Sequence, residues 1–125
     1  MLEQAERKLS NAQSLALRAY RHMCSVSSMA TVYDENRKIA QYVHSTSRGH
    51  EAIQLAAGYQ LQAYDYGAFY YRDESCLLGI GFEPYELMLQ LLARRDDPFS
   101  GGRSYYGHPS VKREDMPRVP HQSAA

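Results

Sequence analysis

The chain has 125 residues and a mass of 14.3 kDa, which is enough for one ordinary domain with a single hydrophobic core. Its 14 basic and 14 acidic residues cancel, so no overall field directs the protein to nucleic acid or to an anionic membrane. No apolar run approaches the roughly 18 residues that cross a bilayer, and the mixed charges of the opening MLEQAERKLSNAQ do not suit a signal peptide, so a cytoplasmic protein is predicted.

Residues 2 to about 32 are predicted to form one long helix. The polar stretch YDENRKIAQYVHSTSRG, residues 33–49, follows it without a regular period and is predicted to be a long connection. The helix prediction rests on a stripe of mostly apolar side chains at spacings of three, four and seven: Leu2, Ala5, Leu9, Ala16, Tyr20, Met23 and Ser27.

A second helix is predicted for GHEAIQLAAGYQLQ, residues 49–62. Glu51 suits the positive end of its dipole, and an apolar face is expected from Ile53, Ala56, Ala57 and residues 59–61. After the turn residues AYDYG, the tetrapeptide AFYY, residues 68–71, has the composition of a short buried strand.

The stretch EPYELMLQLLARRDDP, residues 83–98, carries the clearest helix signal. Pro84 fits the first helical position, and Arg94 and Arg95 complement the negative end of the dipole. Its leucines cover so much of the circumference that the helix is predicted to be deeply buried or packed between two surfaces. The remaining tail, residues 99–125, has no period, so it is expected to be disordered or to lie on protein outside this chain.

Arg72 follows an unusual aromatic run, YGAFYY, and has two interpretations. The simpler one is a surface ion pair with Asp73 or Glu74. In the other, Tyr71 and Arg72 hold an anionic ligand, because a guanidinium makes forked hydrogen bonds to phosphate. The local sequence leaves both open.

No metal site is predicted. No two of the five histidines have the i, i+4 spacing of a zinc site, and Cys24 and Cys76 lie far apart as expected free thiols. His44 and His50 flank the STSRG loop and are candidates for polar contacts at a site. SGGRSYYGHP has glycines but neither phosphate-loop pattern, so it is predicted to be a flexible, closely packed loop.

Several phrases occur together and in one order: STSRGHEAIQLAAGYQL, YYRDESCLLGIGFEPYELMLQLLA, DDPFSGGRSYYGHPS and PHQSAA. Over about residues 15–125 the chain resembles the alpha chain, or the alpha half of a fused chain, of the thiamine-diphosphate-dependent component of 2-oxo acid dehydrogenase complexes. The branched-chain, 2-oxoisovalerate type is the nearest. The resemblance implies an incomplete α/β thiamine-diphosphate-binding fold, here mostly helical with a short strand and a long irregular tail. Residues 1–48 would form an amino-terminal helix and loop, and residues 49–125 the beginning of the dehydrogenase domain.

The resemblance also assigns residues. Tyr71 and Arg72 correspond to contacts with thiamine diphosphate, the arginine reaching the diphosphate, and Ser123 lies at the start of the stretch that touches the pyrimidine. No catalytic or metal-binding residue is carried over. The pocket for the 2-oxo acid would include Val43, His44, Ser45 and Tyr70.

By the same resemblance, the protein would oxidatively decarboxylate branched-chain 2-oxo acids and pass the acyl group to a lipoyl-bearing acyltransferase. It would act with a beta chain or fused beta half as an oligomer. The Mg²⁺ ligands of the family are expected beyond residue 125, so the chain is expected to be an amino-terminal fragment that is inactive alone. Alternatives are a pyruvate or acetoin dehydrogenase alpha chain, or a non-enzymatic helical module that binds other subunits through ELMLQLLA.

Overall fold

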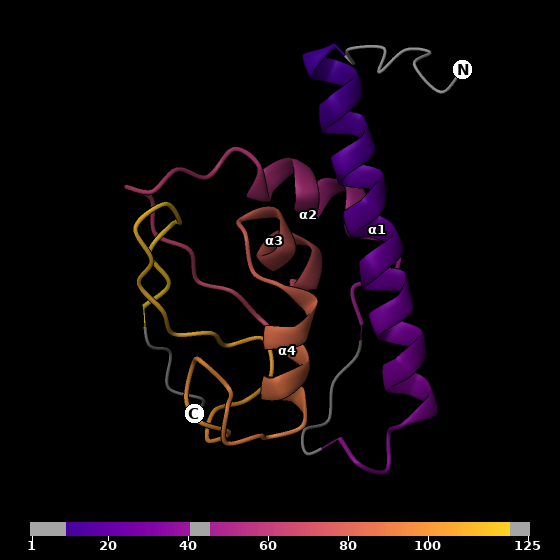
Figure 1. The fold of residues 1–125 in the computed structure, drawn as a ribbon, viewed down its shortest axis with the longest axis vertical. Coiled ribbons are helices and arrows are strands. Elements are labelled where there is room, and N and C mark those ends of the chain that lie inside the picture. Colours follow the sequence, from indigo (N-terminus) through magenta and orange to yellow (C-terminus); the bar gives the residue numbers. More distant parts are fainter. Residues whose placement is uncertain (1–9, 41–45, 121–125) are drawn as a thin grey trace, which may run out of the picture.

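The computed structural model describes residues 10–40 and 46–120. Its helices are α1 (Asn11–Glu35), α2 (Glu51–Gly58), α3 (Glu74–Gly79) and α4 (Pro84–Leu91). Figure 1 shows α1 beside a group formed by the three short helices and the chain that follows them, with the amino-terminal end of α1 projecting beyond α2. None of the helices in the described ranges is both long and apolar enough to cross a membrane.

α1 begins at a capping box. The Ser10 hydroxyl accepts from the Gln13 amide at 3.2 Å, and the Gln13 side chain accepts from the Ser10 amide at 2.9 Å. The helix prediction is confirmed from residue 11 to residue 32, and α1 continues to Glu35. Residues 2–9 lie outside the described part of the chain.

The core face of α1 differs from the predicted stripe. Tyr20 and Ser27 were expected on that stripe, but both are exposed. The buried residues of α1 all lie in its second half, so the face that is buried depends on where the other helices pack. Its buried residues are spaced by three and four: Val26, Met29, Ala30 and Tyr33.

α2 is shorter than the predicted span 49–62 at both ends. Glu51 does act at its start, where the carboxylate accepts from the Gly49 amide at 2.8 Å. The predicted apolar face is wrong for Ile53, Ala56 and Ala57, which are all exposed, whereas Leu61 packs against the core. α2 instead packs on α3 through Leu55 and Gly58, which are both buried. The approach is close enough that a Cβ on Gly58 would lie 2.8 Å from the Cys76 carbonyl oxygen.

The predicted strand at residues 68–71 does not form. In the described ranges, β-pairing is limited to two isolated bridges, of Tyr66 with Arg118 and of Val111 with Val119. Phe69 is buried, and Gly67 directly before the segment is buried too. Its composition suits a strand, but a strand also needs a continuous partner, and none lies beside it among the described residues.

α4 begins as predicted and ends early. Pro84 occupies the first turn, and Glu83 and Glu86 form a capping box. The helix stops because Ala93 adopts a φ of 49°, and the Arg94 amide donates back to the Leu89 carbonyl at 2.9 Å. Arg94 and Arg95 therefore follow the helix, and neither lies in its last turn.

Burial of α4 is confirmed for one face only, since Tyr85 is exposed and Met88 and Leu89 are half-buried. Leu87 and Leu91 are almost completely covered by the chain itself, so this face offers little free surface to the subunit-binding alternative. α3 was not predicted, and it contributes Leu77 and Leu78 to the same core. The core joins side chains from both sides of the proposed boundary at residues 48 and 49, and that boundary stays a prediction.

The tail prediction is wrong for residues 99–120, which fold back onto this chain. Phe99, Tyr106, Met116 and Val119 are buried in the core. The Asp97 carboxylate holds the start of the segment by accepting from the Phe99 amide at 2.9 Å, the Ser100 hydroxyl at 2.8 Å and the Gly102 amide at 3.0 Å. Further along, Arg113 forms an ion pair with Glu86 of α4. Side-chain hydrogen bonds thus replace regular backbone structure here.

Candidate functional site

The candidate site is the turn formed by residues 70–73, directly before α3. The Tyr70 amide donates to the Asp73 carboxylate at 2.9 Å, and the Asp73 amide donates to the Tyr70 carbonyl at 3.0 Å. This reciprocal pair is a local turn of the kind that aspartate stabilises. It fixes the backbone on both sides of Tyr71 and Arg72.

Arg72 is exposed at this turn. Its guanidinium carbon lies 5.2 Å from the centre of the Tyr71 ring, and it makes no ion pair with any residue in the ranges 10–40 and 46–120. The predicted ion pair with Asp73 or Glu74 is therefore wrong. The Asp73 carboxylate instead accepts from the Tyr70 amide within the turn, and Glu74 is buried. A cation–π contact at an exposed site is worth about 0.5–1 kcal/mol and leaves the N–H donors available to an anion.

Aromatic rings surround the turn. The Tyr70 and Tyr71 ring centres lie 4.0 Å apart, and the His108 ring meets Tyr70 edge-on at 5.5 Å. The contact with the Tyr71 hydroxyl raises the pKa of Tyr70 above its ordinary value. Tyr70 is 49% exposed, so its ring is available to a ligand. His108 did not feature in the sequence-based site, although GHP belongs to one of the phrases that carry the resemblance.

Gln54 of α2 supports the turn from the other side. Its amide nitrogen donates to the Arg72 carbonyl at 2.7 Å. Because this bond joins residues 18 positions apart, local sequence gives no signal for it. The carbonyl is held while the guanidinium remains exposed.

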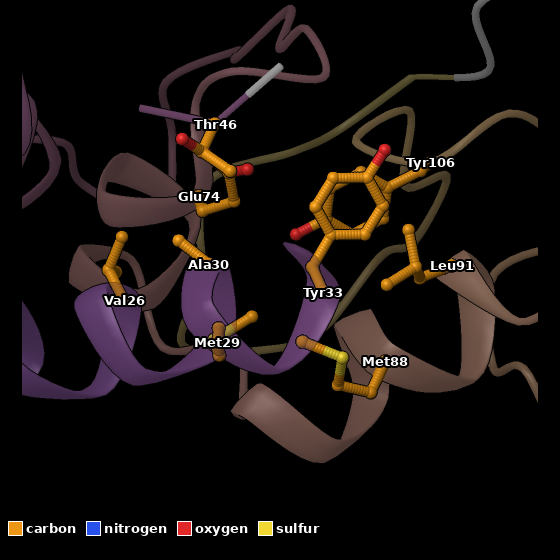
Figure 2. A pocket seen from close by; sticks show the side chains of 9 residues that line it. All are labelled: Val26, Met29, Ala30, Tyr33, Thr46, Glu74, Met88, Leu91 and Tyr106. Carbon is orange, nitrogen blue, oxygen red and sulfur yellow. The ribbon is translucent and has the colours of Figure 1, made fainter. Parts of the chain in front are cut away.

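A buried carboxyl group lies next to the turn, in a pocket between α1, α3, α4 and the tail (Figure 2). Glu74 is only 5% exposed, and its Oε2 has no hydrogen-bond partner among the described residues. Burial raises the pKa of Glu74 to about 7. The cavity volume is about 10 Å³, room for about one water molecule, so no cofactor or 2-oxo acid fits there.

Tyr106 closes the same pocket from the tail. Figure 2 shows its ring beside that of Tyr33 from α1. Burial, and then the neighbouring Glu74, raise the pKa of Tyr106 well above its ordinary value. The Ser47 and Ser75 hydroxyls are buried without a hydrogen-bond partner among the described residues. Polar groups thus gather at the start of α3, where α1 and the tail meet.

A larger hollow of about 260 Å³ lies between α1 and the segment from Leu78 to Pro84. Its polar groups contact one another. The Tyr59 hydroxyl and His22 Nδ1 are 3.0 Å apart, and Arg18 stacks over the Tyr59 ring at 4.4 Å. Desolvation lowers the pKa of His22. Of the predicted site residues that the structure describes, Tyr70, Tyr71 and Arg72, none lines this hollow.

The structure brings three predicted site residues together, Tyr70, Tyr71 and Arg72. The other four lie outside the described ranges, and their assignments stay predictions: Val43, His44, Ser45 and Ser123. Within the described ranges no cluster of His, Cys, Asp or Glu could hold a metal ion, and Cys24 and Cys76 are free. His50 precedes α2 without a side-chain capping bond.

Comparison with known proteins finds a sequence similarity over about half of the chain. The chain is similar to the alpha subunit of 2-oxoisovalerate dehydrogenase from Bacillus subtilis (strain 168), with 40% identity over 62 residues. The likeness is to an oxidoreductase subunit. The matched segment is 49% of this chain and 19% of the relative, so the chain spans about a fifth of the length of that curated relative.

No family model matches the chain, and no solved structure matches it. The similarity therefore supports a relationship to 2-oxo acid dehydrogenases in general.

Proposed function

We propose that this chain belongs to the alpha subunit of a thiamine-diphosphate-dependent 2-oxo acid dehydrogenase, and that Arg72 binds the diphosphate of the cofactor. The observation that carries the proposal is the state of Arg72. Its guanidinium is exposed and unpaired among the described residues, while its backbone is held by Gln54 and by the Asp73 turn. The similarity to the Bacillus subtilis subunit supports the part of the proposal that concerns the family.

The residues of the turn suit an anionic cofactor. A guanidinium presents several N–H donors in a planar fork that matches phosphate oxygens, and such charge-assisted bonds are about twice as strong as neutral ones. A turn that is already fixed loses little conformational freedom on binding. When bound, thiamine diphosphate supplies the decarboxylation chemistry. The contribution of Tyr71 and Arg72 is to bind and orient it.

The remaining assignments follow the resemblance. We propose Ser123 as a contact to the pyrimidine, Tyr70 with Val43, His44 and Ser45 as part of the 2-oxo acid pocket, and Mg²⁺ ligands beyond residue 125. The α/β thiamine-diphosphate-binding fold, a branched-chain substrate, a beta-chain partner and a lipoyl acceptor belong to the same proposal. The exposed Tyr70 ring beside Arg72 supports a substrate position next to the cofactor.

The test is calorimetric titration of inorganic diphosphate and of thiamine diphosphate with Mg²⁺ into the wild-type chain, Arg72→Gln and Arg95→Gln. Arg95 is the matched control, because it is also exposed and makes no ion pair among the described residues. Hydrogen bonds to charged groups contribute about 1.5–3 kcal/mol, so Arg72→Gln is expected to weaken binding roughly ten- to a hundredfold. Arg95→Gln should bind like wild type. No binding by wild type, or equal losses in both variants, would contradict the proposal.

A further inference from the structure

Gln90 is a polar side chain in the middle of the core, with an exposed fraction of 0%. It lies on α4, and both ends of its amide are used. The nitrogen donates to the Ser104 hydroxyl at 2.9 Å, and the oxygen accepts from the Gly107 amide at 2.9 Å. A buried amide with both groups satisfied fixes its partners strongly, since breaking either bond leaves a buried polar group unpaired. Gln90 therefore ties the loop 104–107 to α4.

This loop lies directly against the candidate site. Gly107 is buried with a φ of 75°, and a Cβ there would lie 2.3 Å from the Tyr71 Cα and 2.8 Å from the Tyr70 carbonyl oxygen. Only glycine permits both this conformation and this approach. The next residue, His108, places its ring edge-on against Tyr70.

The turn is thus held between two glutamines that are far from it in sequence. Gln54 contacts the Arg72 carbonyl directly. Gln90 acts through Gly107, whose backbone packs on Tyr70 and Tyr71. Neither side chain touches the exposed guanidinium, so both leave it available.

We propose that Gln90 is a positioning residue of the anion site: it holds Gly107 and His108 against the turn and so sets where Tyr70 and Arg72 present their side chains. This inference rests on the proposed function, because it concerns the same site. A side chain that is displaced by about 1 Å from its ligand contributes much less to binding. A residue that does not touch the ligand can therefore still change the affinity, by positioning one that does.

The test compares inorganic diphosphate affinity in wild type, Gln90→Met, Ser104→Ala and Val26→Ala. Methionine matches the shape of glutamine but cannot bond Gly107 or Ser104. Ser104→Ala removes only the hydrogen bond between Gln90 and Ser104. If Gln90→Met does not fold, Ser104→Ala is the variant that tests the proposal. Val26 is a buried residue of α1 outside the hydrogen-bond network, so Val26→Ala controls for a loss of stability alone. All titrations are made at a temperature where thermal unfolding shows each variant to be folded.

Gln90→Met is expected to weaken diphosphate binding at least about fivefold, and Ser104→Ala about twofold, in line with the cost of misplacing a bound group. The NMR signals of the Tyr70 and His108 rings should shift in the same variants, a signature that a purely stabilising residue would not produce. Val26→Ala should leave affinity and ring signals unchanged.

The two hypotheses fail in different ways. If wild type does not bind diphosphate, the proposed function is wrong and this inference falls with it. If Arg72→Gln weakens binding while folded Gln90→Met and Ser104→Ala bind like wild type, the anion site stands and the positioning role of Gln90 is overturned.

Discussion

The first two turns of α1 and the segment 99–120 are opposites in regularity and burial. Residues 11–18 form a regular, capped helix, yet every one of them is exposed. Residues 99–120 contain no helix, and their only β-pairing is through isolated bridges, yet they place Phe99, Tyr106, Met116 and Val119 in the core. Regular backbone reflects bonds between near neighbours, whereas burial reflects contacts between distant segments. Tertiary stability is therefore expected to depend more on the irregular tail than on the start of α1.

Asp97→Ala is expected to destabilise the chain more than any other change at its surface or in the tail considered below. The carboxylate is 4% exposed and accepts hydrogen bonds from three donors at the start of the tail. Removing an acceptor from buried donors is expected to lower the free energy of unfolding by about 3 kcal/mol. Urea unfolding measures the change. The neighbouring Asp96 is exposed, so Asp96→Ala should stay within about 0.5 kcal/mol of wild type. Equal effects at both positions would contradict the role given to Asp97.

Glu74→Gln tests the pocket where α1 and the tail meet. The folded pKa of Glu74, about 7, lies above the ordinary value of 4.5, so folding disfavours the ionised form. The protonated carboxyl favours the folded state below about pH 4.5, and this contribution is lost as the pH rises through about 7. For the wild-type chain, the resulting decrease in the free energy of unfolding is at most about 3 kcal/mol.

The glutamine variant cannot ionise, so it is expected to gain stability over wild type between pH 4.5 and pH 8. Urea unfolding at several pH values measures the difference. Glu114 is exposed, and Glu114→Gln should show no such pH-dependent difference. Parallel stability curves for wild type and Glu74→Gln would show that Glu74 ionises normally in the folded chain.

Ser10→Ala should loosen the start of α1 without unfolding the chain. Loss of an amino-terminal cap costs about 1 kcal/mol of helix stability, which is a roughly fivefold increase in local opening. Amide hydrogen exchange of residues 13–18 should accelerate accordingly, while the urea midpoint of the whole chain stays the same. Ser14→Ala keeps the cap and serves as control. A large shift in the global midpoint would mean that the exposed turns carry tertiary stability after all.

The smallest effect is expected for Leu15→Ala. Leu15 is an exposed side chain of α1, so its truncation should change the free energy of unfolding by less than about 0.5 kcal/mol. The same change at the fully buried Leu87 of α4 should cost about 2–5 kcal/mol. Comparable losses at the two positions, measured by urea unfolding, would show that another surface covers Leu15.

Local sequence predicted the longer helices but not their packing. The apolar period indicated α1, α2 and α4, and Pro84 marked the first turn of α4. α3 has only six residues, too few to show a helical period, and its burial follows from contacts with α1 and α2. The tail was missed because Asp97 and Gln90 replace backbone ladders with side-chain bonds, and composition does not show such bonds. The prediction of a strand at 68–71 was wrong because composition does not show whether a second strand lies alongside to pair with it.

In the candidate site, too, local sequence predicted some features, whereas others depend on contacts between distant segments. Tyr71 and Arg72 could be selected from the motif that carries the resemblance. The choice between an ion pair and a free guanidinium could not be made, because it depends on Asp73 bonding its own turn. Gln54 and His108 contact the turn, and Gln90 supports it through Gly107, all from segments 18 or more positions away, where no local pattern links them to Arg72.

The most direct test of the anion site is an NMR titration of the wild-type chain with inorganic diphosphate, observing the arginine Nε–H signals. Arg95 provides an internal reference on the same molecule. We expect a saturable shift of the Arg72 signal with little change at Arg95. A flat Arg72 signal, or equal shifts at both arginines, would contradict a diphosphate site at the turn before α3.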